Sequence, residues 1–279
     1  MNEADDDRVD IRRRMSFFAG ASWTLLVVFV IGLALGITEE VRPGAETDVV
    51  NVTAISLIAF GVALFAILRV YAPEGSVRDV FGIRGVPVQS LILAAGLGVG
   101  VHPILSRVDD LLLHKFPQPP EVVEVSARLM RADTWTRRGA LALALAIVFP
   151  AVQETFFRGA LFGTMKRGRE ARIVAVVVAF YFATFAGDPR YVPSLFAFGV
   201  VLGWLRSRTG SVLPTLVAHV AFAAVPVVPI LAGRDPMADV RYSSVLLLGG
   251  VALASAAAFG LHVLTGADED LAAHRELDG

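Results

Sequence analysis

Residues 139–165 read GALALALAIVFPAVQETFFRGALFGTM, and this stretch decides the fold. It contains two ionisable side chains, Glu154 and Arg158, and every other residue is uncharged. A helix of about 20 apolar residues crosses the roughly 30 Å hydrocarbon core of a bilayer, and it satisfies its backbone hydrogen bonds internally. The stretch therefore predicts a transmembrane helix that carries two energetically unfavourable charged groups inside it.

Seven further uncharged runs flank this helix and predict an all-α, polytopic membrane bundle of about eight transmembrane helices. Five are long enough to span alone, and two are shorter and could instead be re-entrant. Gly32/Gly36 and Gly96/Gly100 have the small-xxx-small spacing that permits close helix packing. The long runs are residues 15–38, 49–68, 85–106, 209–233 and 242–266, and the short runs are 173–187 and 191–205.

Composition supports this class of protein. Hydrophobic residues make up 55% of the chain, charged residues only 18%, and the mean hydropathy is +0.65, whereas soluble domains carry about 25% charged residues. The net charge of −1 gives no bulk attraction for nucleic acid. Because cysteine is absent, disulfides, thiolate metal sites and cysteine nucleophiles are excluded.

Arginine and lysine placement predicts the orientation. Basic residues gather before the first run and in alternate connections, namely 69–84, 166–172 and 206–208, while the intervening short loops are poorer in them. We expect both termini to be cytoplasmic, with tails at 1–14 and 267–279 around a membrane domain at 15–266. The segment 107–138 is expected outside, with a surface helix around 122–130. The predicted location is the plasma membrane, as a multi-pass protein of a bacterial inner membrane.

Three ionisable residues inside the spans are candidates for function. Glu154 and Arg158 are four residues apart, so they share a helix face and are predicted to pair. His219 lies about 14 Å from the cytoplasmic end of its span and Glu154 about 17 Å, a similar depth. A carboxylate and an imidazole at one level could hold a water for hydrolysis, relay protons or form a structural strut. His102 and His262 are expected to be structural.

Three stretches resemble the CAAX-protease and bacteriocin-processing (CPBP) family of intramembrane endopeptidases. VQETFFRG at 152–159 is similar to the family's EExxxRG motif. FGIRG at 81–85 and GWLRSRTGSVLPTLVAH at 203–219 support the resemblance, as does the eight-span layout. The resemblance covers about residues 81–226, and it implies an intramembrane protease acting on prenylated CAAX tails, bacteriocin leaders or membrane proteins.

The resemblance also implies which positions matter, and this chain departs at three of the four catalytic ones. The family's general base, the first Glu of its motif, is Gln153 here. The His of FxxxH is Ala186, and the Asn of HxxxN, which stabilises the oxyanion, is Ala223. Glu154, Arg158 and His219 match the family motifs.

Three interpretations follow. We favour a catalytically impaired protein that binds a transmembrane or prenylated partner in the former substrate cavity. The alternative is an active metallo- or glutamate-type endopeptidase that uses Glu154 and His219 with His102 or Asp188. A proton-linked transporter is the third, although the sequence has no inverted repeat to support it. Partners other than membrane lipids are proteins and not nucleic acid. No cofactor is expected, and a divalent metal such as zinc belongs only to the active alternative.

Overall fold

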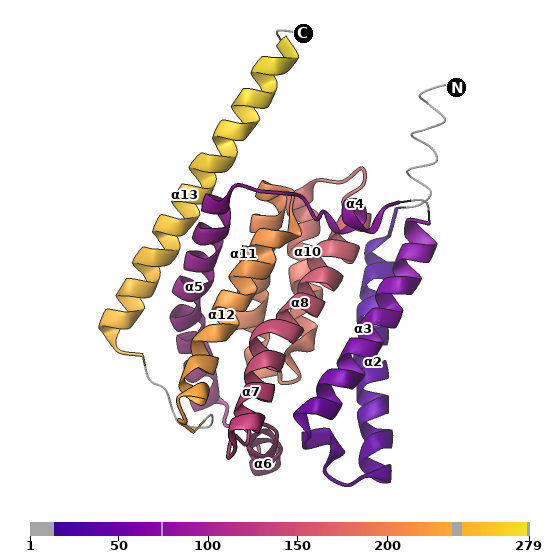
Figure 1. The fold of residues 1–279 in the computed structure, drawn as a ribbon, viewed down its shortest axis with the longest axis vertical. Coiled ribbons are helices and arrows are strands. Elements are labelled where there is room, and N and C mark those ends of the chain that lie inside the picture. Colours follow the sequence, from indigo (N-terminus) through magenta and orange to yellow (C-terminus); the bar gives the residue numbers. More distant parts are fainter. Residues whose placement is uncertain (1–13, 74, 236–241, 278–279) are drawn as a thin grey trace.

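The structure is a computed structural model that describes residues 14–73, 75–235 and 242–277 (Figure 1). Helices dominate this part of the chain, and no strand occurs in it, so the all-α prediction is confirmed. The predicted tail at 1–14 lies outside the described residues, Arg14 excepted. The last helix continues to Leu277, within the predicted tail at 267–279.

Eight helical segments occupy the eight predicted ranges. The fourth is a continuous run of α7 (Trp135–Leu143), η2 (Ala144–Val148), α8 (Phe149–Glu154), η3 (Thr155–Leu161) and α9 (Phe162–Met165). The others are α2 (Phe17–Val41), α3 (Val49–Tyr71), α5 (Val88–Lys115), α10 (Ala171–Ala183), α11 (Val192–Thr209), α12 (Val212–Leu231) and α13 (Ser244–Leu277). Short elements in the connections are η1 (Ala45–Thr47), α4 (Val77–Phe81), α6 (Pro120–Leu129), η4 (Thr184–Ala186) and η5 (Pro189–Tyr191). The helix α6 lies where the surface helix is predicted.

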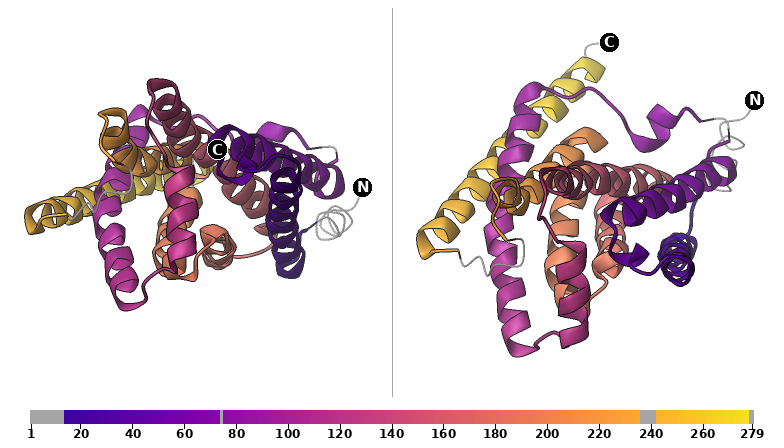
Figure 2. Two further views of the ribbon diagram at one scale, coloured as in Figure 1. Left: turned by 90° about the horizontal axis from the view of Figure 1, so that it is seen from below. Right: turned by 60° about the horizontal axis from the view of Figure 1, so that its bottom comes forward.

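Among the described residues, six of these segments are long and apolar enough to cross a membrane by themselves. They are α2, α3, α5, the composite helix Trp135–Met165, α12 and the first part of α13. Figures 1 and 2 show the α2–α3 pair and α13 at opposite edges of the bundle, with α8, α10, α11 and α12 between them. The chain therefore forms a polytopic helical membrane protein.

The basic connections meet at one end of the bundle, here called the basic end. Ser211 Oγ donates to the carbonyl oxygen of Arg84 at 2.8 Å, and Arg167 Nη1 donates to that of Tyr71 at 3.1 Å. Arg14 donates to Gly168 on the same side. The described residues of the remaining connections lie at the opposite end, here called the far end (Figure 1). This alternation is what the predicted orientation requires of the chain.

The short segments α10 and α11 run between both ends of the bundle. Beside the start of α11, Arg190 donates to the carbonyl oxygens of Phe116 and Pro117, which follow α5. At its other end, Arg206 lies against Gly82, which precedes α5. α11 has 18 residues against 28 in α5, and its two ends lie beside the segments that follow and precede α5.

Glycines set the closest helix contacts, but only at one of the two predicted pairs. A Cβ at Gly100 would lie 2.6 Å from the backbone nitrogen of Ala254, so α5 and α13 touch through their backbones there. Gly32 and Gly36 face open space, with no atom within 4 Å of a built Cβ. The small-xxx-small spacing thus coincides with close packing within the described residues at Gly96/Gly100 and not at Gly32/Gly36.

Candidate functional site

The motif helix changes its winding where the ionisable residues occur. Glu154 ends α8, and the next seven residues, which include Arg158, form the π-helical segment η3. A second π-helical segment, η2, precedes Pro150. Proline has no backbone N–H and so cannot donate a hydrogen bond to the preceding turn. π-Helical turns are frequent at functional sites. The sequence gives no signal for either segment beyond the proline.

The three motif residues that match the family come together in the interior. Arg158 Nη1 donates to Glu154 Oε1 at 3.1 Å, and His219 Nδ1 lies 2.9 Å from the same oxygen. Arg158 Nη2 also donates to the carbonyl oxygen of Gly199 in α11 at 3.0 Å. Glu154 and Arg158 are fully buried and His219 is 7% exposed. The predicted pairing and the predicted common depth of Glu154 and His219 are both confirmed.

Aromatic rings enclose this cluster. The guanidinium carbon of Arg158 lies 4.5 Å from the centre of the Phe182 ring, a cation–π contact. The rings of Phe182 and Phe198 meet the His219 ring edge-on at 5.7 and 5.2 Å. The enclosure keeps water away from the ion pair, so its Coulomb attraction is strong and the desolvation of its charges is also costly.

The polar cluster is incompletely satisfied. Glu154 Oε2 and Arg158 Nε are buried without a hydrogen-bond partner in the described part of the chain. A neutral His219 that donates its Nδ1–H to Glu154 keeps Nε2 as its basic nitrogen. The arrangement can therefore orient an imidazole, and it leaves one carboxylate oxygen available for a further hydrogen bond.

The substituted family positions contribute no titratable group. Gln153 and Ala186 are half-buried, and Gln153 makes no side-chain hydrogen bond among the described residues. Ala223 is half-buried one turn after His219 in α12. A catalytic zinc ion needs three protein ligands. Glu154 and His219 are the two candidate ligands that meet here, and no group of three His, Cys, Asp or Glu occurs elsewhere in the described residues. The residues present do not fit a zinc site.

The other candidates for a rearranged site lie apart from Glu154. His102 Nδ1 is 3.1 Å from the hydroxyl of Tyr242, and its ring contacts Phe222, which stacks on Phe198. The His102 ring thus joins the aromatic layer around His219 without reaching the carboxylate. Asp188 lies in the far-end connection between α10 and α11, where it accepts from Arg190 Nε at 2.7 Å. His262 Nδ1 lies 3.1 Å from Arg208 Nη2.

Arg206 is part of the site's framework, although the sequence indicates it only as an orienting charge. It is 2% exposed, and its Nε donates to the carbonyl oxygen of Arg158 at 3.0 Å. Its guanidinium rests on Gly82, where no Cβ would fit. Gly82 in turn accepts a hydrogen bond from the backbone of Val212 at 3.0 Å. The three stretches that carry the resemblance are therefore packed together around Arg206.

The fold and this cluster define a polytopic helical membrane protein with a buried carboxylate, guanidinium and imidazole shared by three helices. Residues 135–225 match the family model described as type II CAAX prenyl endopeptidase Rce1-like. That range contains both the motif helix and His219, so the resemblance seen in the sequence is confirmed there, while FGIRG lies outside it. Neither a curated protein nor a solved structure matches the chain.

Proposed function

We propose that this protein is a non-hydrolysing relative of the CAAX-type membrane endopeptidases, which binds a transmembrane or prenylated protein in place of cleaving it. The proposal places it in the plasma membrane of a bacterium with its basic end in the cytoplasm, because arginine-rich loops favour that side.

One observation carries the proposal. The carboxylate of Glu154 is buried and is held by both Arg158 and His219 through one oxygen. A general base needs a protonatable group within reach of the attacking water. The neighbouring position, which the resemblance assigns to the base, is the neutral amide of Gln153. We therefore assign the cluster a structural role, in which it holds the motif helix against α12.

A prenylated or transmembrane partner fits the same reasoning. In the matched region the motif helix contacts α11 through Arg158 and α12 through Glu154. The resemblance implies that the groups which would activate water and stabilise an oxyanion are replaced by Gln153, Ala186 and Ala223. Loss of a base lowers the rate by about 10²–10⁴-fold and loss of an oxyanion donor by about 10²–10³-fold. Neither substitution removes the apolar environment that would bind a lipidated segment.

The test uses the full chain reconstituted in liposomes with a quenched fluorogenic prenyl-peptide. We expect the prenylated peptide to bind more tightly than the same peptide without its prenyl group, and we expect no hydrolysis above protein-free liposomes. Cleavage by the wild-type protein that disappears in both His219→Ala and Glu154→Gln would refute the proposal. Equal binding of the two peptides would refute its partner class.

The Glu154–His219 pair supports a second candidate, an active endopeptidase with a rearranged site. The carboxylate orients the imidazole through Nδ1 at 2.9 Å, and a carboxylate that fixes an imidazole leaves Nε2 to accept a proton from water. This candidate predicts cleavage that is lost in His219→Ala. It is the outcome that the hydrolysis assay distinguishes from the first.

A further inference from the structure

A second polar site lies at the far end of the bundle. A pocket of about 410 Å³ opens between the α2–α3 turn, the end of α6 and the start of α7. Four arginines from these separate segments line it, and Asp48 is its single acidic lining residue. The arginines are Arg42, Arg128, Arg131 and Arg137.

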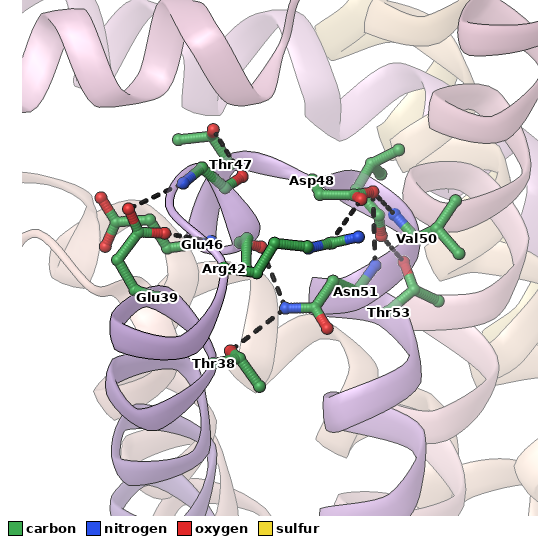
Figure 3. Close-up of polar contacts among 12 residues, drawn as sticks. Thr38, Glu39, Arg42, Glu46, Thr47, Asp48, Val50, Asn51 and Thr53 are labelled. Carbon is green, nitrogen blue, oxygen red and sulfur yellow. Dashed lines mark hydrogen bonds and ion pairs between the residues drawn. The ribbon is translucent and has the colours of Figure 1, made fainter.

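The wall of this pocket is built by a fixed turn (Figure 3). The Glu39 carboxylate accepts from the backbone nitrogens of Gly44 and Glu46 at 2.8 and 3.0 Å. Asp48 caps α3 through the nitrogen of Val50 at 3.0 Å. The amide of Asn51 donates to the carbonyl oxygen of Ala45 at 3.0 Å. These bonds fix the backbone of the turn that forms one wall of the pocket.

Four arginines and one aspartate line the pocket, and the Glu39 carboxylate in its wall interacts with the charge of Arg128. Arg42 is neutralised inside it by Asp48, at 2.7 Å. Arg128 and Arg131 pair with carboxylates that do not line the pocket, at 3.2 and 3.0 Å, and these pairs are exposed and therefore weak. Those carboxylates belong to Glu124 and Asp133.

Arg137 is the half-buried member of the four. It donates to the carbonyl oxygens of Arg128, Arg131 and Thr47, and it makes no ion pair within the described residues. Carbonyl oxygens fix the orientation of its guanidinium without cancelling its charge. Arg137 thus presents an oriented guanidinium group, and such groups bind phosphate oxygens through charge-assisted hydrogen bonds.

An apolar groove of about 270 Å³ continues from the pocket between α3 and the α7–η2 helix. It begins at Val49, the residue after Asp48, and at Ala140, about one turn after Arg137. Its walls include Leu57 and Leu143, which are 43% and 57% exposed. Groove and pocket therefore follow one another along the same pair of helices.

An exposed tryptophan begins the helix that carries Arg137. Trp135, the first residue of α7, is 73% exposed, and the guanidinium of Arg138 lies 5.2 Å from its ring centre. Exposed tryptophans beside arginines are typical of the level of lipid headgroups. A bilayer with its headgroups at the level of Trp135 would place the polar pocket among the headgroups and the groove among the acyl chains.

We infer that this pocket and groove together bind one phospholipid with an anionic headgroup. Arg137, Arg128 and Arg131 hold the phosphate, and one acyl chain lies along α3 against Leu57 and Leu143. The site is separate from the Glu154 cluster, so it does not depend on the proposed function.

The test is lipid retention by the full-length protein in native mass spectrometry, titrated with dioleoylphosphatidylglycerol. One bound lipid per chain is expected at low lipid concentration. Arg137→Gln should weaken binding roughly fivefold or more, since each arginine near an anionic lipid contributes about that factor. Arg107→Gln, on the far-end half of α5 and 51% exposed in its side chain, is the matched control and should bind as the wild type does.

Further arms separate the phosphate from the acyl chain. Ala54→Trp fills the groove and should weaken lipid binding, whereas Ile58→Trp, on the same helix outside the groove, should not. Dioleoylglycerol, which lacks phosphate, should not compete. Equal competition by inorganic phosphate alone would show a free-anion site and overturn the lipid assignment. Unchanged retention in folded Arg137→Gln would also overturn it. If that variant does not fold, the exposed double change Arg128→Gln/Arg131→Gln must weaken binding or the inference is wrong.

Discussion

His219 Nδ1 and Glu154 Oε1 lie 2.9 Å apart although 65 residues separate them in the chain. The same carboxylate oxygen accepts from Arg158 Nη1 at 3.1 Å. One buried oxygen thus connects α12 to both α8 and the π-helical segment η3. Removing any member leaves the others desolvated without their full set of partners.

The first prediction concerns the ion pair of Glu154 and Arg158. Glu154→Gln and Arg158→Met should each lower the free energy of unfolding in detergent by about 3–5 kcal/mol, because each leaves an unpaired buried charge. The double variant should lose clearly less than the sum of the two. Chemical denaturation of the four proteins measures this coupling energy.

The matched control is the exposed pair Arg172–Glu170, 3.9 Å apart with side chains 87% and 60% exposed. Its single variants should change stability by less than about 1 kcal/mol, because exposed pairs are screened by solvent. If the losses at Glu154 and Arg158 were additive, the two side chains would not be coupled directly.

Much of the fold follows from the sequence. The eight helix positions can be predicted because a bilayer requires each uncharged run to form a helix. What the sequence leaves undetermined is local winding and pairwise packing. The π-helical segments η2 and η3 have no residue signature beyond Pro150. Whether Gly36 or Gly100 meets another backbone depends on which helix lies opposite, and spacing alone does not encode this.

The second prediction concerns Gly82, which has a φ of +63° and carries the Arg206 guanidinium against its Cα. Gly82→Ala should lower stability by about 2–3 kcal/mol, combining left-handed strain of about 1–2 kcal/mol with displacement of a buried guanidinium. Gly44 also has a positive φ, but no atom lies within 4 Å of a Cβ built on it. Gly44→Ala should therefore lower the free energy of unfolding by about 1 kcal/mol. Gly85→Ala has neither constraint and should be near neutral. Equal losses of stability in Gly44→Ala and Gly82→Ala would show that displacement of Arg206 contributes nothing to the effect at Gly82.

The third prediction tests the contact of α5 with α13. Gly100→Val places side-chain atoms against the backbone of Ala254 and Gly250, so the helices must separate. We expect a loss of about 1–3 kcal/mol or more, as for other overpacked interiors. Gly36→Val projects into open space and should leave the unfolding midpoint nearly unchanged. If both variants lost similar stability, the loss of glycine flexibility and not the close packing of α5 on α13 would explain the effect.

Within the site, the pairing of Glu154 with Arg158 can be predicted from helix spacing, and the approach of His219 from depth. The structural role of Arg206 cannot be predicted from the sequence. Its position near a span end suggests an orienting charge, and its burial results from the fold of the FGIRG connection over it. Gly82 makes that possible, because only a residue without a Cβ leaves room for the guanidinium.

The fourth prediction is a pH dependence at Asp188, outside the spans. The guanidinium of Arg190 lowers the pKa of Asp188 from 3.8 to about 2, helped by the Arg190 backbone and by Gln118, while burial acts in the opposite direction. A lowered folded-state pKa stabilises the protein above the unfolded pKa and stops doing so as the pH falls through the folded one. The stability difference between wild type and Asp188→Asn should therefore be constant above about pH 5 and shrink from pH 4 toward pH 2. A difference that does not change with pH would contradict the ion pair.

The last prediction restores the missing chemistry. Gln153→Glu supplies a base, Ala186→His a second imidazole and Ala223→Asn an oxyanion donor. Ala223 lies one turn from His219 on α12, and Ala186 follows Phe182, whose ring contacts His219. Because residues that act as a unit are strongly non-additive, each single change should leave hydrolysis of a prenyl-peptide within about tenfold of background. The triple variant should raise it by at least about 10²-fold, in line with the size of base catalysis.

The control for this gain is His219→Ala added to the triple variant, which should return hydrolysis to background. Initial rates in liposomes, with folding checked by thermal unfolding, measure all five proteins. A folded triple variant that binds the prenyl-peptide without cleaving it would show that the three positions do not converge on one carbonyl group. In that case the framework around Glu154, Arg158 and Arg206 would retain the family's packing without the geometry of its catalytic site.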